Sequence, residues 1–136
     1  MKLLMIYADS FRYKTTTKTL DDFPEINEDK SIKNALVAFI QAEENDENDS
    51  GKTVTKLIKN IKWASKKNST KKVVLHSFAH LSESKANPNF SKEIFNKAEE
   101  RLKNSEFEVF QTPFGYFLDL DIQAPGNSQA RIFKSF

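Results

Sequence analysis

The sequence predicts an α/β (α+β) fold in which a mixed β-sheet carries two α-helices. Two amphipathic segments with helical spacing, residues 52–67 and 88–102, support this class, and apolar runs of strand length alternate with them. The predicted order is strand–strand–strand–helix–strand–helix–strand–strand, with one more short strand at the end. A length of 136 residues suits one domain with its own core, so residues 1–136 are expected to form a single domain.

The first third of the chain is expected to be mainly strand. Residues 2–8 form a continuous apolar run, typical of a strand buried on both faces. Residues 11–17 alternate in character and predict a second strand, with a turn at Ala8-Asp9-Ser10 between the two. The polar residues 21–33 predict a loop, and the apolar residues 35–42 predict a central strand.

The remaining elements follow from periodicity and turn signals. After an acidic, exposed segment at residues 43–49, the period becomes helical from Lys52 and ends at Asn68-Ser69-Thr70. Asn87-Pro88 predicts the start of the second helix, because proline suits the first helical position. Further strands are expected at residues 107–110, 117–122 and 130–136, separated by turns at residues 113–116 and 125–127.

Composition excludes several classes of protein. There is no cysteine, which excludes disulfides and cysteine-based zinc sites and fits an intracellular, cytoplasmic location. No apolar run approaches the ~18 residues of a membrane-spanning helix, and the apolar N-terminal run is too short for a signal peptide, so no membrane partner is expected. Three glycines and no phosphate-loop motif argue against a nucleotide-binding loop.

Both histidines lie in the segment that starts as the strand at residue 72 and ends in small, polar residues. A metal pair at His76 and His80 is disfavoured, because no cysteine or carboxylate accompanies them. His76 is expected to be structural, whereas His80 lies past the strand and is equally consistent with a loop residue or a ligand contact. Two further features, the helix lysines (56, 59, 62, 66, 67) and the pair Asp119 and Asp121, fit either a binding role or a solvated face.

Four segments together resemble a known family. They are Lys2-Leu3-Leu4-Met5-Ile6-Tyr7-Ala8-Asp9, Leu36-Val37-Ala38-Phe39-Ile40 followed by Glu43, Phe78-Ala79-His80-Leu81-Ser82, and Thr112-Pro113-Phe114-Gly115-Tyr116-Phe117. In this combination and at this separation they resemble the archaeal N-terminal editing domain of threonyl-tRNA synthetase, over nearly the whole chain.

The resemblance implies a D-aminoacyl-tRNA deacylase-like fold, usually a homodimer, without a metal or organic cofactor. The implied reaction is hydrolysis of L-serine wrongly attached to the 3′ end of tRNA(Thr), and the rest of the synthetase is a further possible partner. Editing is needed because a missing methyl group discriminates by only ~1–3 kcal/mol, so a synthetic site cannot exclude the smaller amino acid.

The resemblance also implies the site. His80 is the implied catalytic residue, helped by main-chain groups and the tRNA ribose hydroxyl. The implied substrate-binding residues are Ala42, Ser77, Phe78, Ala79, Pro113, Phe114, Tyr116, Phe117, Leu118 and Arg131.

Four of these positions depart from the family pattern. A family lysine falls on Leu118, a tyrosine on Phe117, a glutamate on Arg131 and a proline on Ser77. The favoured hypothesis is a domain that still edits. The alternatives are a catalytically weakened tRNA-binding or dimerisation module of the same fold, or a D-aminoacyl-tRNA deacylase, although the Ser-Gln-Phe-Thr motif and the Gly-Pro pair expected of that enzyme are absent.

Overall fold

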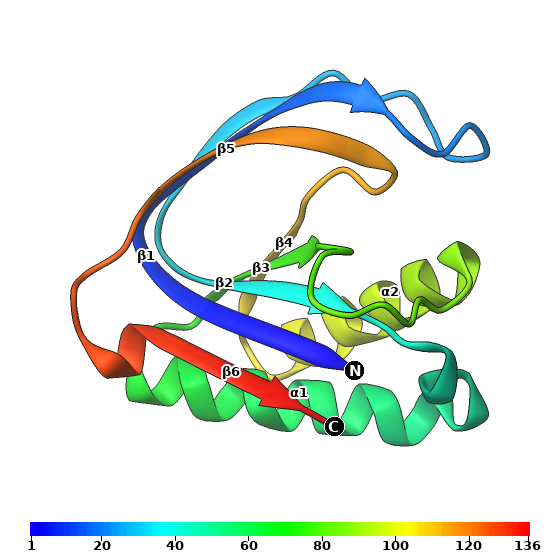
Figure 1. Cartoon of the computed structure of the whole chain (residues 1–136). Helices are drawn as coiled ribbons and strands as arrows, with labels where there is room; N and C mark the ends of the chain where they lie inside the picture. Colours follow the sequence, from blue (N-terminus) through cyan, green and yellow to red (C-terminus); the bar gives the residue numbers. More distant parts are fainter.

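A six-stranded mixed sheet forms the centre of the structure, a computed structural model that describes residues 1–136 (Figure 1). The strands are β1 (Lys2–Lys18), β2 (Asp29–Gln41), β3 (Lys72–Ser77), β4 (Glu108–Gln111), β5 (Tyr116–Gln123) and β6 (Arg131–Ser135). Their order is β4-β3-β2-β1-β5, and β6 also pairs with β1. β3 runs parallel to β2 and β4, whereas β1 is antiparallel to its three neighbours.

Two helices, α1 (Ser50–Lys67) and α2 (Pro88–Asn104), lie on the same side of the sheet (Figure 1). Each begins with a side-chain cap: Asp49 accepts from the Lys52 amide, and Asn87 accepts from the Asn89 amide, with Pro88 at the first helical position. The mixed sheet with two helices that the sequence predicts is therefore confirmed, as is the start of the second helix. The last predicted strand is present as β6.

The predicted turn at Ala8-Asp9-Ser10 is wrong, because residues 2–18 form one continuous strand. The predicted loop is also too long: β2 already starts at Asp29, and this polar end of the strand is held by a two-pronged ion pair between Arg12 and Asp29. The polar start of β2 is a strand because it forms backbone hydrogen bonds with β1, and this long-range pairing could not be predicted from the local sequence.

What the sequence presents as a turn is a corner of the sheet. Asn34 adopts a left-handed backbone conformation, with φ of 54°, and lies in β2 opposite Asp9. On each strand two consecutive exposed or half-exposed residues separate buried ones, so that Ala8 and Phe11 both point into the same hydrophobic cluster. The alternation of faces switches at the corner, and β1, β2 and β5 curl back over the rest of the sheet (Figure 1).

This curl creates two separate cores. The larger core lies between the sheet and the helices and includes Leu3, Leu57 and Ile94. The smaller core lies inside the curl and includes Phe11 and Phe39. The two faces of β1 thus serve different cores, with the interior of the curl left partly open.

The outer surface of the curl is charged. Asp119 and Asp121 are exposed on β5, and their register partners on β1 are Lys14 and Arg12. Opposite charges at facing positions on exposed strands are typical of a solvated face, which supports that interpretation of the aspartate pair. Neither helix is long and apolar enough to cross a lipid bilayer.

Candidate functional site

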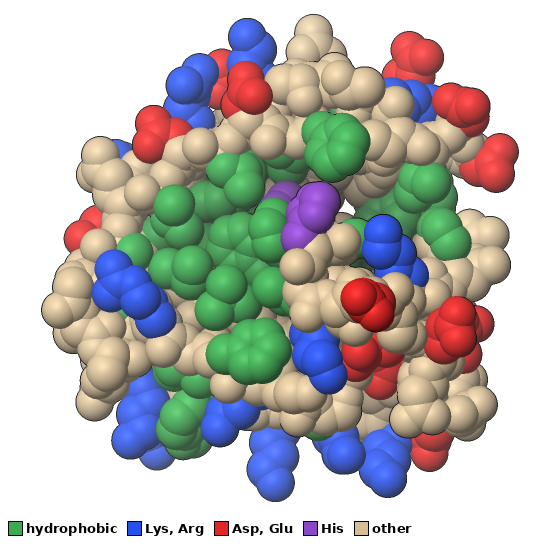
Figure 2. Space-filling view, in the orientation of Figure 1, with side chains coloured by type: hydrophobic (Ala, Val, Ile, Leu, Met, Phe, Trp, Pro, Cys, Tyr) green, Lys and Arg blue, Asp and Glu red, His purple; other side chains and the backbone are tan.

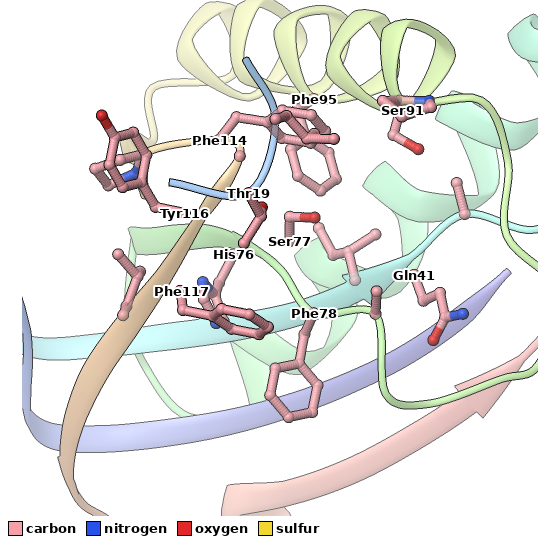
Figure 3. A pocket seen from close by; sticks show the side chains of 18 of the residues that line it. Thr19, Gln41, His76, Ser77, Phe78, Ser91, Phe95, Phe114, Tyr116 and Phe117 are labelled. Carbon is pink, nitrogen blue, oxygen red and sulfur yellow. The ribbon is translucent and has the colours of Figure 1, made fainter. Parts of the chain in front are cut away.

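A cavity of about 380 Å³ opens where β3 ends, between the curled-over β5 and the start of α2 (Figure 3). Of the residues that the resemblance implies, those lining this cavity are Ala42, Ser77, Phe78, Ala79, His80, Pro113, Phe114, Tyr116, Phe117 and Leu118. Segments far apart in the sequence are brought together because β2, β3 and β4 are parallel and end at one edge of the sheet, which β5 then covers.

The residues that follow β3 line the cavity, and two of them have unpaired main-chain amides. The Phe78 amide still donates to the Ile40 carbonyl at 3.0 Å, as a continuation of the ladder between β2 and β3. The two following amides, those of Ala79 and His80, donate to no acceptor within the chain. The chain therefore holds two adjacent free N–H donors at the rim of the cavity, where a bound carbonyl or anion can accept from them.

His80 is exposed at this rim, and its ring meets the ring of Phe78 edge-on with the centroids 5.0 Å apart. This contact restricts the orientation of the imidazole without occupying its nitrogens.

His76 has both a structural position and a place in the cavity wall. It is only 5% exposed, hydrogen-bonds through Nδ1 with the Thr112 hydroxyl at 2.8 Å, and packs against Phe39 and Phe78. Burial lowers the pKa of His76 to about 4, so its imidazole is neutral at physiological pH. The structural role expected from the sequence is supported, and the cavity gains a neutral ring as part of its floor.

The wall opposite β3 is largely apolar. Leu118 and Leu120 contribute aliphatic side chains, and Phe117 is 57% exposed at the opening. The Tyr116 hydroxyl accepts a hydrogen bond from the Ile26 amide at 2.9 Å, which ties this tyrosine to the loop between β1 and β2. The only charged side chain that the cavity wall adds is that of Lys85.

Arg131 does not line the cavity. It lies at the start of β6, where its guanidinium donates to the carbonyls of Pro125 and Asn127 at 2.8 and 3.5 Å. The expectation that Arg131 lines this cavity is therefore corrected. β6 pairs with residues 2–6 of β1, whereas β5, which covers the cavity, pairs with residues 10–18.

Gln41 is a lining residue that sequence reasoning missed. It is 3% exposed at the end of β2, and its amide makes four hydrogen bonds to the loop after β3. Its Oε1 accepts from the amides of Leu81 and Ser82 at 2.7 and 2.8 Å, and its Nε2 donates to the carbonyls of Ser82 and Ser84 at 2.7 and 2.9 Å. A polar residue near the end of an otherwise apolar strand was the available signal.

Glu43, two residues after Gln41, holds the same loop in place. It accepts from the Ser82 hydroxyl at 2.6 Å and lies 2.7 Å from the ammonium group of Met1. Burial opposes its ionisation, but these two partners hold the pKa of Glu43 below its ordinary value.

The other lining residues were not predicted from the sequence; they come from β2, from β5, from the loops and from the start of α2. They are Thr19, Leu20, Ile40, Lys85, Ala86, Pro88, Ser91, Phe95, Gly115 and Leu120. No group of three or more histidine, cysteine, aspartate or glutamate side chains is arranged to hold a metal ion.

Comparison with known protein families supports the resemblance. A family described as the archaea-specific editing domain of threonyl-tRNA synthetase matches residues 1–136. The chain belongs to this family.

Curated relatives agree with this assignment. The chain is 30% identical over 137 residues to a threonine–tRNA ligase of Methanosphaera stadtmanae. It is 31% identical over 137 residues to that of Methanothrix thermoacetophila and 30% identical over 138 residues to that of Pyrococcus horikoshii. In each case the match covers 99% of this chain and 22% of the relative, so this editing domain spans about a fifth of the length of those ligases.

Among solved structures, the c-Myc DNA unwinding element binding protein superposes with a TM-score of 0.68 at 12% identity, covering 100% of this chain and 99% of that chain. At this identity the likeness shows a shared fold alone.

We predict that Gln41→Leu loosens the loop after β3. The substitution leaves four main-chain groups of the loop without their partner, so the free energy of unfolding should fall by about 2 kcal/mol or more. Amide hydrogen exchange within residues 79–85 should accelerate, above all at Leu81 and Ser82, whose amides donate to Gln41.

The matched control is Gln111→Leu, which removes side-chain hydrogen bonds between β4 and α2 away from the cavity. It should leave exchange at residues 79–85 unchanged. Equal exchange in the two variants would contradict the role assigned to Gln41.

We predict that His76 makes stability depend on pH in mildly acidic solution. In the unfolded chain His76 is protonated below its ordinary pKa of 6.5, whereas in the folded chain it becomes protonated only near pH 4. The free energy of unfolding should therefore fall as the pH decreases through this window, by on the order of 3 kcal/mol at most. Urea unfolding at several pH values measures it, with His76→Phe as the non-titrating reference. Parallel pH profiles for the two proteins would contradict the prediction.

Proposed function

We propose that this editing domain hydrolyses the ester between L-serine and the terminal adenosine of tRNA(Thr). The observation that carries the proposal is the cavity at the end of β3, with two free main-chain donors at its rim. Its volume of about 380 Å³ falls in the range of small-molecule sites. The partners proposed with it are the 3′ end of a serine-charged tRNA and the remainder of a threonyl-tRNA synthetase.

The proposed chemistry relies on main-chain and substrate groups. The amides of Ala79 and His80 would donate to the ester carbonyl and to the oxyanion that forms when water attacks it. Because Gln41 and Glu43 fix the following loop, these donors are oriented before the substrate arrives, which avoids a reorganisation cost. The opposite wall, with Phe117 and Leu118, supplies packing and no charge.

His80 is the proposed catalytic side chain. Its exposed ring at the rim can orient the attacking water or the ribose hydroxyl next to the ester. His76 stays neutral and buried, and is left to shape the floor.

The alternative function is a tRNA-binding or dimerisation module with weak hydrolysis. The apolar character of Phe117 and Leu118 favours it, since these side chains offer no polar group to a substrate amine or hydroxyl. Activity on a D-aminoacyl-tRNA has no observation in its favour and is an outcome of the test below.

We also propose that the domain forms a homodimer through the open interior of the curl. Phe133 on β6 is the register neighbour of Leu4 on β1 and is 53% exposed, while Leu120 and Ile122 on β5 are 39% and 36% exposed. Figure 2 shows hydrophobic side chains gathered on this face beside the histidines. An exposed apolar surface of this kind is typical of an interface.

The proposed activity predicts that the isolated chain deacylates L-seryl-tRNA(Thr) faster than buffer alone and faster than it deacylates L-threonyl-tRNA(Thr). His80→Ala should slow the reaction by about 10–100-fold without changing the fold. Single-turnover deacylation with labelled serine measures the rate.

The same assay with a D-aminoacyl-tRNA separates the two hydrolase hypotheses. Hydrolysis of seryl-tRNA(Thr) no faster than in buffer alone would contradict the editing proposal and favour the alternative of a tRNA-binding or dimerisation module. An unchanged rate in His80→Ala would remove His80 from the catalytic site.

The proposed dimer predicts that Phe133→Glu yields a monomer, because the charge would be buried in the interface. Light scattering after size-exclusion chromatography measures the mass. The control is Trp63→Glu, which alters an exposed aromatic residue on α1, outside the curl, and should remain dimeric. A monomeric parent protein, or monomers from both variants, would contradict the proposed interface.

A further inference from the structure

The exposed face of α1 carries a concentration of positive charge that neither the cavity nor the hydrophobic cores use. We call this set, together with Trp63, the basic face; its lysines are Lys52, Lys56, Lys59, Lys62, Lys66 and Lys67. All six are exposed, and α1 contains no aspartate or glutamate. Because the net charge of the whole chain is only +2, the rest of the molecule is net acidic, and the positive charge is localised on this helix.

None of these lysines takes part in an ion pair. α2 has the opposite pattern: Lys97 lies 2.7 Å from Glu93, and Lys103 lies 3.0 Å from Glu99. Ion pairs between side chains four residues apart stabilise a helix. Because α1 has none, its lysines create an unbalanced positive potential that an anionic partner can neutralise.

An exposed aromatic side chain lies in the middle of the basic face. Trp63 is 46% exposed, and the ammonium groups of Lys67 and Lys134 lie 5.7 and 5.0 Å from its ring. The neighbouring Lys56 lies 6.0 Å from the ring of Phe136. Figure 2 shows lysine and arginine side chains in a row along the lower edge of the molecule, where Figure 1 places α1.

We propose that the basic face binds the sugar–phosphate backbone of the tRNA at a place separate from the cavity. No residue of α1 lines the cavity, so this is a second contact with the same RNA. Lys52 to Lys66 span about 21 Å along the helix axis, a length that follows several successive phosphates of one strand. Lysine ammonium groups with an interposed tryptophan combine phosphate neutralisation with stacking or packing on a sugar or base.

The RNA partner rests on the proposed function, since a domain that removes serine from tRNA must hold the tRNA body. An anionic membrane would be expected to face several large apolar residues among the lysines, and the exposed face of α1 offers Trp63 alone.

The test compares two double variants with the same change in charge. Lys59→Gln/Lys66→Gln neutralises two lysines of the basic face that have no hydrogen-bond partner within the chain, and Lys97→Gln/Lys103→Gln neutralises two lysines of α2. Fluorescence anisotropy with a tRNA(Thr) transcript at several salt concentrations measures affinity. The first variant should bind several-fold more weakly, and its plot of log affinity against log salt should be shallower by about 1–2. The α2 variant should stay close to the parent protein.

A small probe distinguishes this proposal from the function of the cavity. A non-hydrolysable seryl-aminoadenosine, which has no RNA body, should bind equally to the parent protein and to both double variants. Loss of tRNA affinity confined to the first variant supports the basic face whether or not the probe binds, and failure of the probe alone contradicts only the cavity.

Two results would overturn the inference. Equal tRNA affinity and salt dependence in both double variants would show that the basic face is only solvated. Binding to anionic lipid vesicles that depends on Lys59 and Lys66, with tRNA binding unaffected, would assign the face to a membrane surface instead. Trp63→Ala beside Trp63→Phe then tests the ring: only the alanine variant should weaken tRNA binding.

Discussion

The corner between the two halves of β1 and β2 determines where everything else in this domain can lie. At Asn34 the backbone turns left-handed, and the alternation of buried residues changes phase on both strands. Had the strands continued straight, β5 would extend into solvent and the end of β3 would lie on an open edge. The curl brings β5 over β3, which produces the small core around Phe11 and Phe39, the cavity, and the open apolar interior.

Around the cavity, several polar side chains are held in place by hydrogen bonds within the chain, and few side chains are charged. The side-chain amide of Gln41 forms its hydrogen bonds with the loop after β3. Glu43 is held by the Ser82 hydroxyl and the N-terminal ammonium. The neutral ring of His76 is fixed by Thr112. The main-chain amides of Ala79 and His80 are left unpaired, and Lys85 is the only lysine, arginine or carboxylate in the cavity wall. Backbone donors in fixed positions therefore supply part of the polar character of the site.

Local pattern was enough to predict the two helices, most strands and the mixed sheet, because these depend on periodicity and caps within a short window. The family resemblance, carried by the segments around Phe78 and Phe114, identified ten of the 22 residues that line the cavity. The corner escaped prediction because its cause, pairing between Asp9 and Asn34 regions across two strands, is non-local. Gln41 escaped because its four partners lie about forty residues away, and Arg131 was misplaced because sequence spacing does not show which edge β6 pairs with.

A cavity whose wall carries only one lysine, separated from a basic helix, suits the discrimination that the proposed editing reaction would demand. Serine and threonine differ by one methyl group, so contacts with the tRNA body are identical for both and add affinity without selectivity. Charge placed in the cavity would strengthen binding of either aminoacyl group. In the proposed binding mode, charge on α1 would instead hold tRNA(Thr) carrying either amino acid and leave the choice to packing against Phe117 and Leu118. The two proposals together place affinity for tRNA and selectivity for the amino acid on different faces of the molecule, and they predict that salt weakens tRNA affinity without changing the proposed preference for serine.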